Sequence, residues 1–460
     1  MRYRLSLKDQ QSLAAIAAMV LLVFAVLFGG ASRAHELRLA LVELASLPLL
    51  VFAFGQMSQS DGWRIHRFSL ALLGGLAALP LIQILPLPPG LWTSLPNREQ
   101  LVLALDLAGL PAGWSSWSLT PDKTWRSFLA LLPPVSMFLG VLVVTAESRR
   151  RLVYAILAAA TAAIMLGTAQ LASGGEQLYP WRTTDAGAVV GFFANRNHLA
   201  TLCLIALPFA AVLGARVMRR GRGSNPWALW LSLLLMGLIV VALGVIRSRT
   251  GILLLAPVLI ASLLAAWTAA GRGRPHAFLW GAAGVSAAAI TAVGVLALGP
   301  ILDRFDRLSA TEGRLENWPI VAAAAEAHLP FGSGIGSFDA VFRSVEPLAQ
   351  LDPTFFNQAH NDYLETWLET GWFGLALLVG FLAWFARRAF SAWRGEVGTD
   401  RDLQRASTIA IVAVLAHSVV DYPLRTVTIA TIFAVCCAIL ELAGRTDGDG
   451  AARRTERGRV

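Results

Sequence analysis

The chain contains 460 residues, of which 56% are hydrophobic and only 15% charged, and its formal net charge is +9. A soluble domain normally carries about 25% charged residues, so the composition excludes an ordinary soluble protein and also a charge-rich disordered chain. Three cysteines, Cys203, Cys436 and Cys437, lie in apolar runs, which excludes a disulfide-stabilised scaffold. With a mean hydropathy of +0.60, the sequence indicates an all-α, multi-pass membrane protein.

About twelve apolar segments approach the length of a spanning helix, which needs about 20 mostly apolar residues. The segment at 406–421 is short and ends at Asp421, so we expect it to span only in part. The twelve segments are 11–29, 37–56, 68–86, 126–146, 151–171, 197–215, 227–246, 251–270, 277–299, 372–390, 406–421 and 424–443.

The positive charges fall mainly on one side of these segments. If the N-terminus lies inside, the inside segments carry a net charge of about +14 and the remainder about −5. This bias predicts a topology with both termini on the inner side of the membrane and a basic, disordered tail at 444–460. The basic excess then follows from topology, so a nucleic-acid partner is not expected.

Three outer segments are long, at about 87–125, 172–196 and 300–371. The last is the largest piece outside the predicted spans, and it precedes the tenth span. Because long loops between packed elements usually carry function, we expect any chemistry to face outward. The corresponding units are 1–299 with nine spans, the outer loop 300–371, and 372–443 with the last three spans.

The first motif, Asn195-Arg196-Asn197-His198, precedes the sixth span on the outside. Its amides and its cation suit sugar hydroxyls or a phosphate. The alternative is that Asn195 or Asn197 caps the helix.

The second motif, Arg247-Ser248-Arg249-Thr250-Gly251, is the tight outer joint between the seventh and eighth spans. Two arginines in so short an outer loop are unexpected, because the positive-inside rule places most basic residues on the inner side. A guanidinium group binds phosphate oxygens in a bidentate manner. The alternative is an arginine that extends to lipid headgroups.

The third motif, Gly313-Arg314-Leu315-Glu316-Asn317-Trp318-Pro319, lies in the large outer loop. Arg314 is a further candidate phosphate ligand. A surface ion pair with Glu312 or Glu316 is the alternative.

The fourth motif extends from Gln358 to Gly371 and contains His360, Asp362 and Glu365. At helical spacing, His360 would share a face with Leu364 and Trp367, and Asp362 would lie in the first turn, where the helix dipole favours a carboxylate. A neutral imidazole at this outer position can accept a proton from a hydroxyl near pH 7. Alternatively, His360 only binds a backbone carbonyl in an interfacial helix.

The fifth motif extends from His417 to Arg425 and includes Asp421. His417 and Asp421 are four residues apart and would share a helix face, which predicts a structural His–Asp pair at membrane depth. The segment Gly332–Gly336 is rich in glycine but follows no strand, so it is interpreted as a flexible turn and not as a nucleotide site. No spacing of acids or histidines resembles a metal site.

Together these motifs are more specific than any one of them. The sequence resembles the O-antigen ligase/polymerase superfamily of bacterial envelope glycosyltransferases, over most of the chain. The resemblance rests on Gly191–His198, Ser248–Gly251, Gly313–Trp318, Pro330–Phe338, Ala359–Glu365 and His417–Arg425, with Pro86–Trp92 and Ser118–Pro121 in the first long outer loop.

The resemblance implies a membrane glycosyltransferase of the GT-C type in the bacterial inner membrane, with a periplasmic active site and no metal or other cofactor. The implied partners are an undecaprenyl-diphosphate-linked glycan donor, a lipid A–core or glycan acceptor, and membrane lipids. By motif position, His360 resembles the general base, Arg249 and Arg314 resemble the diphosphate ligands, and Arg247 is a further candidate. The large loop resembles a lid.

Several residues are left as substrate-binding or supporting candidates. Within the superfamily, a ligase, a polymerase and a protein O-oligosaccharyltransferase share these motifs, because they differ in the acceptor. The competing class is a transporter or flippase of a lipid-linked or small anionic solute, which would also use outer arginines. The supporting candidates are Asn195, Arg196, Asn197, His198, Asp362, Glu365, His417, Asp421 and Arg425.

Overall fold

The computed structural model describes residues 7–31, 36–60, 62–174, 178–181, 187–220, 226–270, 280–288, 291, 309–348, 356–395 and 398–443. Within these ranges the chain is mostly helical, and one antiparallel pair of two-residue strands joins Pro86–Leu87 to Ser115–Ser116. The elements are α1 (Leu7–Phe28), α2 (Glu36–Ser58), α3 (Gly62–Ile65), α4 (Arg67–Ile84), β1 (Pro86–Leu87), α5 (Pro89–Trp92), α6 (Glu99–Leu107), β2 (Ser115–Ser116), α7 (Pro121–Ala130), α8 (Leu132–Val143), α9 (Ala146–Ser173), α10 (Arg196–Arg220), α11 (Pro226–Ile246), α12 (Arg249–Ala270), α14 (Ser309–Ala327), α15 (Phe338–Val345), α16 (Asp362–Arg394), α17 (Thr399–His417), the 3-10 helix η3 (Pro423–Arg425) and α18 (Val427–Glu441).

In the described part of the chain, nine helices are long and apolar enough to cross a membrane, judged by length and composition. They coincide with nine of the twelve predicted spans, so the chain is an all-α, multi-pass membrane protein. The predicted span 406–421 falls on α17, and 424–443 falls on α18, which is apolar but has only 15 residues. Most of the predicted span 277–299, and the whole tail 444–460, lie outside the described residues. The count of twelve therefore stays a prediction.

The helix α10 lies at the centre of the bundle and is buried along nearly its whole length. It packs against α9, α11, α12 and α17. Small residues such as Ala206, Ala210 and Ala211 have at most 1% of their surface exposed. Because lipid tails are as apolar as leucine, helices inside a membrane associate through such close packing and not through the hydrophobic effect.

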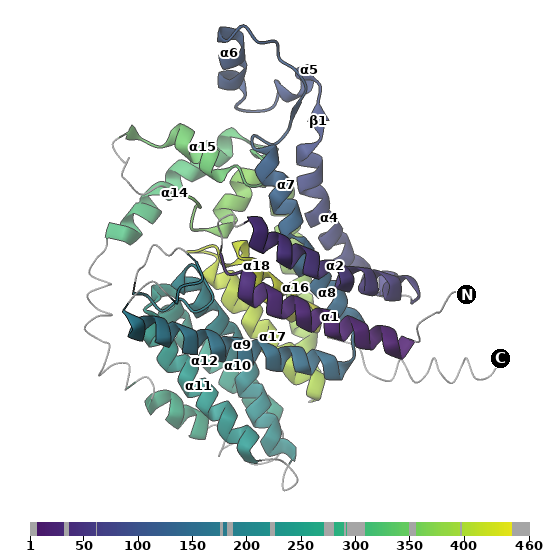
Figure 1. Cartoon of the computed structure of the whole chain (residues 1–460), viewed down its shortest axis with the longest axis vertical. Coiled ribbons are helices and arrows are strands. Elements are labelled where there is room, and N and C mark those ends of the chain that lie inside the picture. The colour runs from purple at the N-terminus through teal and green to yellow at the C-terminus, as the bar shows by residue number, and fades with distance from the viewer. Residues whose placement is uncertain are drawn as a thin grey trace, which may run out of the picture.

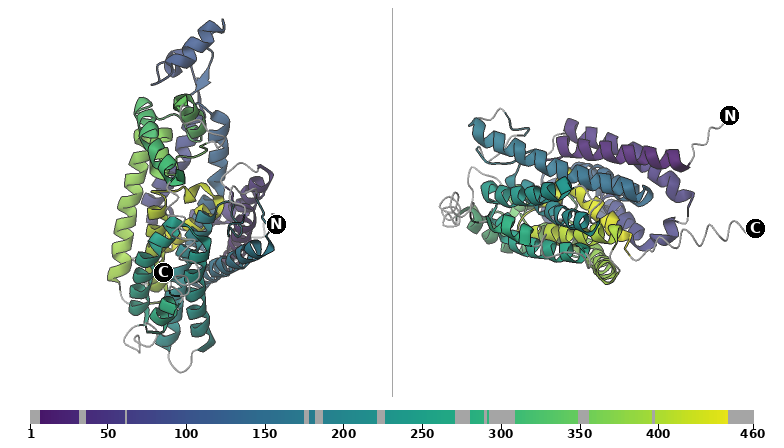
Figure 2. Two further views of the ribbon diagram at one scale, coloured as in Figure 1. Left: turned by 90° about the vertical axis from the view of Figure 1, so that its left-hand side faces the viewer. Right: turned by 90° about the horizontal axis from the view of Figure 1, so that it is seen from below.

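A second group of helices, α1, α2, α8 and α18, packs on the other side of the bundle. Figure 1 shows α5 and α6 at one end of the long axis and α10, α11 and α12 toward the other, with α14 and α15 between them. In Figure 2, α16 appears as the long yellow-green helix along one edge of the bundle. We call residues 86–120, which contain β1, α5, α6 and β2, the outer head.

Buried ion pairs fasten the ends of helices that the charge pattern places inside. Glu441 on α18 accepts hydrogen bonds from His66 at 2.7 Å and from Arg388 on α16 at 2.6 Å. Asp402 on α17 lies 2.9 Å from Arg219 on α10. Buried charges must be paired to offset their desolvation, so these contacts fix the helices at the end of the bundle away from the outer loops.

Gly371 divides α16 into an outer piece, 362–370, and a membrane piece that begins at Trp372. Its backbone has φ 55° and ψ −141°, a region open essentially to glycine alone. A Cβ atom at this position would lie 2.2 Å from the carbonyl oxygen of Pro330, which accepts the Trp372 amide at 3.0 Å. The kink therefore lets the outer loop approach the helix backbone and sets the direction of the outer piece.

We expect Gly371→Ala to destabilise the protein, because the positive φ alone costs about 1–3 kcal/mol and the Pro330 carbonyl must also move. The matched control is Gly74→Ala inside α4, where nothing lies within 4 Å of the added Cβ. That change should be neutral or stabilise by about 0.5–1 kcal/mol. The thermal unfolding midpoint of the purified protein in detergent measures both changes, and equal midpoints would contradict the argument.

Candidate active site

His360 occupies the tight turn directly before α16. Its φ is 49°, and Asn361 caps the helix by accepting the amides of Tyr363 and Leu364 at 3.0 Å each. The prediction that His360 lies on the helical face of Leu364 is therefore wrong, because Asn361 is the N-cap and α16 begins only at Asp362, after His360. Asp362 does lie in the first turn, as predicted.

The turn that carries His360 is fixed on both sides. The Ala359 amide donates to Glu365 Oε2 at 2.9 Å, and Trp318 of α14 donates to the Ala359 carbonyl at 3.2 Å. The Asp362 amide donates to the Ser418 carbonyl at 2.9 Å. These bonds hold the left-handed conformation of His360, which would otherwise be costly for a non-glycine residue.

The His360 ring lies between two aromatic rings and faces a carboxylate. Its centroid is 4.8 Å from that of Tyr422 and 5.4 Å from that of Phe356. Its Nδ1 is 3.4 Å from Asp421 Oδ1, and 12% of the side chain remains exposed. A nearly buried imidazole with a carboxylate on Nδ1 presents Nε2 as the nitrogen that can accept a proton.

Asp421 is fully buried and is held by groups from three parts of the chain. The Tyr422 amide donates to Asp421 Oδ1 at 2.9 Å, and the Asn197 side-chain amide donates to Asp421 Oδ2. Ser248 Oγ in turn donates to Asn197 Oδ1 at 2.8 Å. We call the series His360, Asp421, Asn197 and Ser248 the polar chain. It brings together four of the five sequence motifs.

The polar chain ends beside the start of α12, where Arg249 is the first helical residue and is partly buried. Arg196 is the first residue of α10, next to Asn197. The N-termini of α10 and α12 therefore both lie at this end of the polar chain, and helix N-termini favour anions. Arg247 is exposed and has φ 54°. Arg314 lies on α14, but its side chain is outside the described part of the structure.

The remaining polar candidates pack around the polar chain. His198 is 1% exposed, and its ring centroid lies 5.4 Å from that of Tyr422. Asn195 Oδ1 accepts the Asn197 amide at 2.9 Å, which is the capping alternative.

The predicted side-chain pair of His417 with Asp421 is not formed. Asp421 bonds to the His417 carbonyl through its amide at 3.0 Å, whereas its carboxylate faces His360 and Asn197. His417 contacts Thr201 Oγ1 at 3.0 Å instead. The reason is that α17 ends at His417, so the helical spacing does not continue to Asp421.

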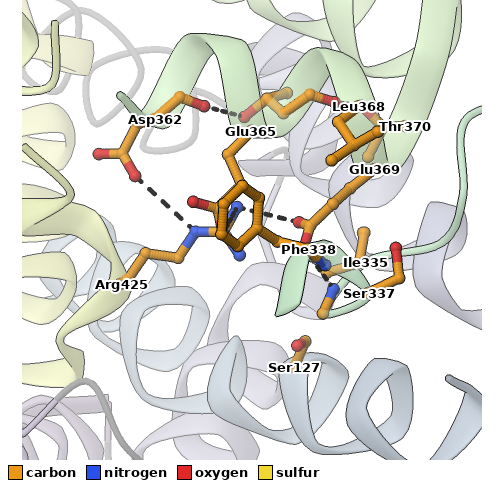
Figure 3. Close-up of polar contacts among 12 residues, drawn as sticks. Ser127, Ile335, Ser337, Phe338, Asp362, Glu365, Leu368, Glu369, Thr370 and Arg425 are labelled. Carbon is orange, nitrogen blue, oxygen red and sulfur yellow. Dashed lines mark hydrogen bonds and ion pairs between the residues drawn. The ribbon is translucent and has the colours of Figure 1, made fainter. Parts of the chain in front are cut away.

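Arg425 binds three buried carboxylates of α16. Its Nη2 lies 2.9 Å from Glu369 and 3.2 Å from Glu365, and its Nε lies 3.8 Å from Asp362. Figure 3 shows the guanidinium between these side chains. We call these four residues the arginine cluster. Because Arg425 is engaged by protein carboxylates, the cluster supports the site and does not offer a free cation to a substrate.

Glu369 was missed by the sequence analysis. Its Oε1 accepts the amides of Gly336 at 2.8 Å and Phe338 at 3.3 Å (Figure 3). The segment Gly332–Gly336 is thus a bonded turn packed on α16, not a loose one. The available signal was the spacing of Asp362, Glu365 and Glu369, which places three acids on one helix face and requires a cation nearby.

The described residues contain no group of three or more His, Cys, Asp or Glu that could hold a metal ion. Arg196 and Arg249, at the starts of α10 and α12, place guanidinium groups next to the polar chain. This arrangement can do two things chemically. It can accept a proton at His360 and balance a nearby negative charge with guanidinium groups.

Residues 231–379, about a third of the chain, match the family model described as O-antigen ligase. No curated protein matches the chain. The match confirms the resemblance to the O-antigen ligase/polymerase superfamily, and it contains Arg249, Arg314 and His360. At this general level, it supports a glycosyltransferase-like membrane enzyme with a lipid-linked glycan and an acceptor as substrates.

We expect Arg425→Met to lower stability strongly, because it leaves three buried carboxylates without their cation. Breaking a buried ion pair costs about 3–5 kcal/mol. The matched control is Arg343→Met on α15, whose pair with Asp339 is 57% exposed on the arginine side. Exposed pairs contribute about 0–1 kcal/mol. Thermal unfolding in detergent compares the two, and an Arg425→Met midpoint equal to that of Arg343→Met would disprove the role of the cluster.

Proposed function

Because residues 231–379 match O-antigen ligases, we propose that the protein transfers a glycan from undecaprenyl diphosphate to an acceptor hydroxyl at the periplasmic face of the inner membrane. The acceptor is lipid A–core in a ligase or a growing glycan in a polymerase. The observation that carries the proposal is the His360–Asp421 pair at one end of the polar chain, with Arg249 at the other end.

In this mechanism His360 is the general base. The acceptor oxygen attacks the anomeric carbon, the bond from that carbon to the phosphate oxygen breaks, and the hydroxyl proton passes to His360 Nε2. Asp421 holds Nδ1 and stabilises the imidazolium that forms, as an orienting carboxylate does in hydrolase triads. The 3.4 Å separation fits a bond that shortens when substrate binds.

The leaving diphosphate takes the bonding electron pair and needs its charge balanced more than it needs a proton. Arg249, with Arg314 and Arg247, supplies this balance in the proposal, and the N-termini of α10 and α12 add their dipoles. The Ser248–Asn197 bond links the diphosphate end of the site to Asp421. In the proposal, the Ser248–Asn197–Asp421 hydrogen bonds and the His360–Asp421 ion pair connect the diphosphate end of the site to the base.

The helix α14 carries Arg314. It also contacts the turn that carries the proposed base His360, through the Trp318–Ala359 hydrogen bond. In the proposal, the loop closes over the donor, and this contact passes the closure on to the turn that carries His360. A lid of this kind also excludes water, which would otherwise hydrolyse the donor.

We expect His360→Ala to abolish transfer while the protein still inserts into the membrane. Undecaprenyl-linked glycan should then accumulate on the periplasmic face, as measured by lipid extraction and glycan analysis of cells that carry only the variant. Normal glycan from this variant would refute the base assignment. Accumulation of the donor on the cytoplasmic face would instead indicate a transporter.

We expect Asp421→Asn to lower the transfer rate by about 10²-fold or more, within the range that a positioned base contributes. Because the charge that stabilises protonated His360 is lost, the acid limb of the pH–rate profile should also move to lower pH. The control is Asp339→Asn on α15, which removes an outer carboxylate that is 27% exposed. An unchanged pH profile in Asp421→Asn would contradict the positioning role.

Arg249→Gln should lower transfer by about 10²–10³-fold, as the loss of one charge-stabilising donor typically does. Arg249→Lys should recover only part of this activity, because an ammonium lacks the bidentate geometry of guanidinium. Arg343→Gln, on the exposed side of α15, serves as the charge control. Transfer assays with purified lipid-linked donor measure the effect, and equal rates in Arg249→Gln and Arg343→Gln would reject the assignment.

A further inference from the structure

A cavity of about 360 Å³ lies at the base of the outer head. Its walls come from the outer end of α4, from α6, from β2 and from the segment that leads into α7. The volume is in the range of small-ligand sites, about 300–1,000 Å³, and gives room for one sugar residue. The lining residues are Ile84, Pro86, Arg98, Leu101, Trp114, Ser115, Ser116, Ser118, Leu119 and Pro121.

Arg98 is the one charged residue in this lining, and it is only 2% exposed. Its Nη2 donates to the Trp117 carbonyl, whereas its Nε has no hydrogen-bond partner. Within the described ranges, no carboxylate lies at ion-pair distance from it. Burial lowers the pKa of the Arg98 guanidinium to about 10, so it stays protonated at neutral pH. A buried charge without a counter-ion is costly, and an anionic ligand would supply one.

The rest of the lining suits a sugar. Ser115, Ser116 and Ser118 line the same cavity as the arginine, and the hydroxyl groups of Ser116 and Ser118 bond to the Ser118 carbonyl and to Thr124. Trp114 is 69% exposed, so its ring is available to cover the apolar face of a sugar ring. A few polar groups among apolar and aromatic walls are the usual composition of a small-ligand site.

The cavity is hydrogen-bonded to the glycine segment Gly332–Gly336, which packs on α16, the helix that follows the turn with His360. Trp117 Nε1 donates to the Gly332 carbonyl at 3.1 Å, and the Leu119 amide donates to the Ser333 carbonyl at 2.9 Å. Leu119 packs on the apolar cluster that also contains Ala359 and contacts Phe356. Phe356 in turn touches the His360 ring. Leu119 of the cavity and Phe356 beside His360 therefore border the same apolar cluster, whereas Arg249 follows Ser248 at the far end of the polar chain.

We propose that this cavity binds an acidic sugar residue of the acceptor glycan, with Arg98 on its phosphate or carboxylate group and Trp114 on its ring. The assignment to the acceptor rests on the proposed transfer function. In the proposed function the donor diphosphate lies on the Asp421 side of His360, whereas the cavity borders the apolar cluster that Phe356 also contacts, and we therefore assign the cavity to the acceptor. Binding of the acidic sugar itself does not depend on turnover.

The binding test uses the full-length protein in detergent, titrated with glucose 1-phosphate, glucuronate and glucose and followed by saturation-transfer NMR. At least one acidic sugar should bind at least about tenfold more tightly than glucose, and the comparison decides between phosphate and carboxylate. Arg98→Gln should weaken that binding by about 10- to 100-fold, as loss of a hydrogen bond to a charged group does. The control is Arg126→Gln, which removes an exposed arginine of α7 and should leave binding unchanged.

If Arg98→Gln does not fold, Trp114→Ala provides the test instead. Because Trp114 is exposed, this substitution should weaken binding without loss of structure. Binding that survives both variants overturns the proposal, as does equal binding of glucose. Binding that is lost in Arg249→Gln but kept in Arg98→Gln also overturns it, because the acidic sugar would then occupy the diphosphate site.

A kinetic test addresses the acceptor assignment separately. In transfer assays, Arg98→Gln should raise KM for the acceptor by about tenfold or more and leave KM for the lipid-linked donor unchanged. A raised donor KM with an unchanged acceptor KM refutes the assignment to the acceptor. An active His360→Ala variant refutes the proposed function and leaves the binding result standing, so the two proposals can fail independently.

Discussion

The bonds that Arg425 makes to Asp362, Glu365 and Glu369 hold the segment that carries Asp421 against the helix that follows His360. One partly buried guanidinium joins the segment after α17 to the outer piece of α16. Two of the carboxylates then use their remaining oxygens on other segments, since Glu365 accepts the Ala359 amide and Glu369 accepts those of Gly336 and Phe338. Because breaking a buried ion pair is expensive, the cluster holds the base turn and the glycine segment to the bundle as one unit.

The polar chain depends on that unit. Asp421 lies four residues before Arg425, so fixing the arginine also fixes the carboxylate that faces His360. On the other side, Asn197 and Ser248 bring in the starts of α10 and α12. The two arginines therefore differ in role: Arg425 is paired with carboxylates and serves structure, whereas in the proposed function Arg249 balances the charge of the substrate.

The nine described spans follow closely from hydropathy, because a lipid environment forces each spanning segment to be apolar and internally hydrogen-bonded over about 20 residues. The motifs that contain His360, Arg249 and Asn197 were also visible in the sequence. The partner of Asp421 was not. Helical spacing favoured His417, but the end of α17 at His417 redirected the carboxylate. Glu369 was missed for a similar reason, since its partners Gly336 and Arg425 are 33 and 56 residues away.

The sequence by itself determined the all-α membrane fold, the side of the membrane expected to carry chemistry, and the residue types available for it. These depend on local composition and on the sign of charge in each loop, which need no knowledge of distant contacts. Only the tertiary structure decided which residues meet: His360 with Asp421, Asn197 with Ser248, Arg425 with three acids, and Arg98 with a cavity. Such pairings are set by where helices end and kink, as at His417 and Gly371, and by the requirement that every buried charge be paired or face a ligand.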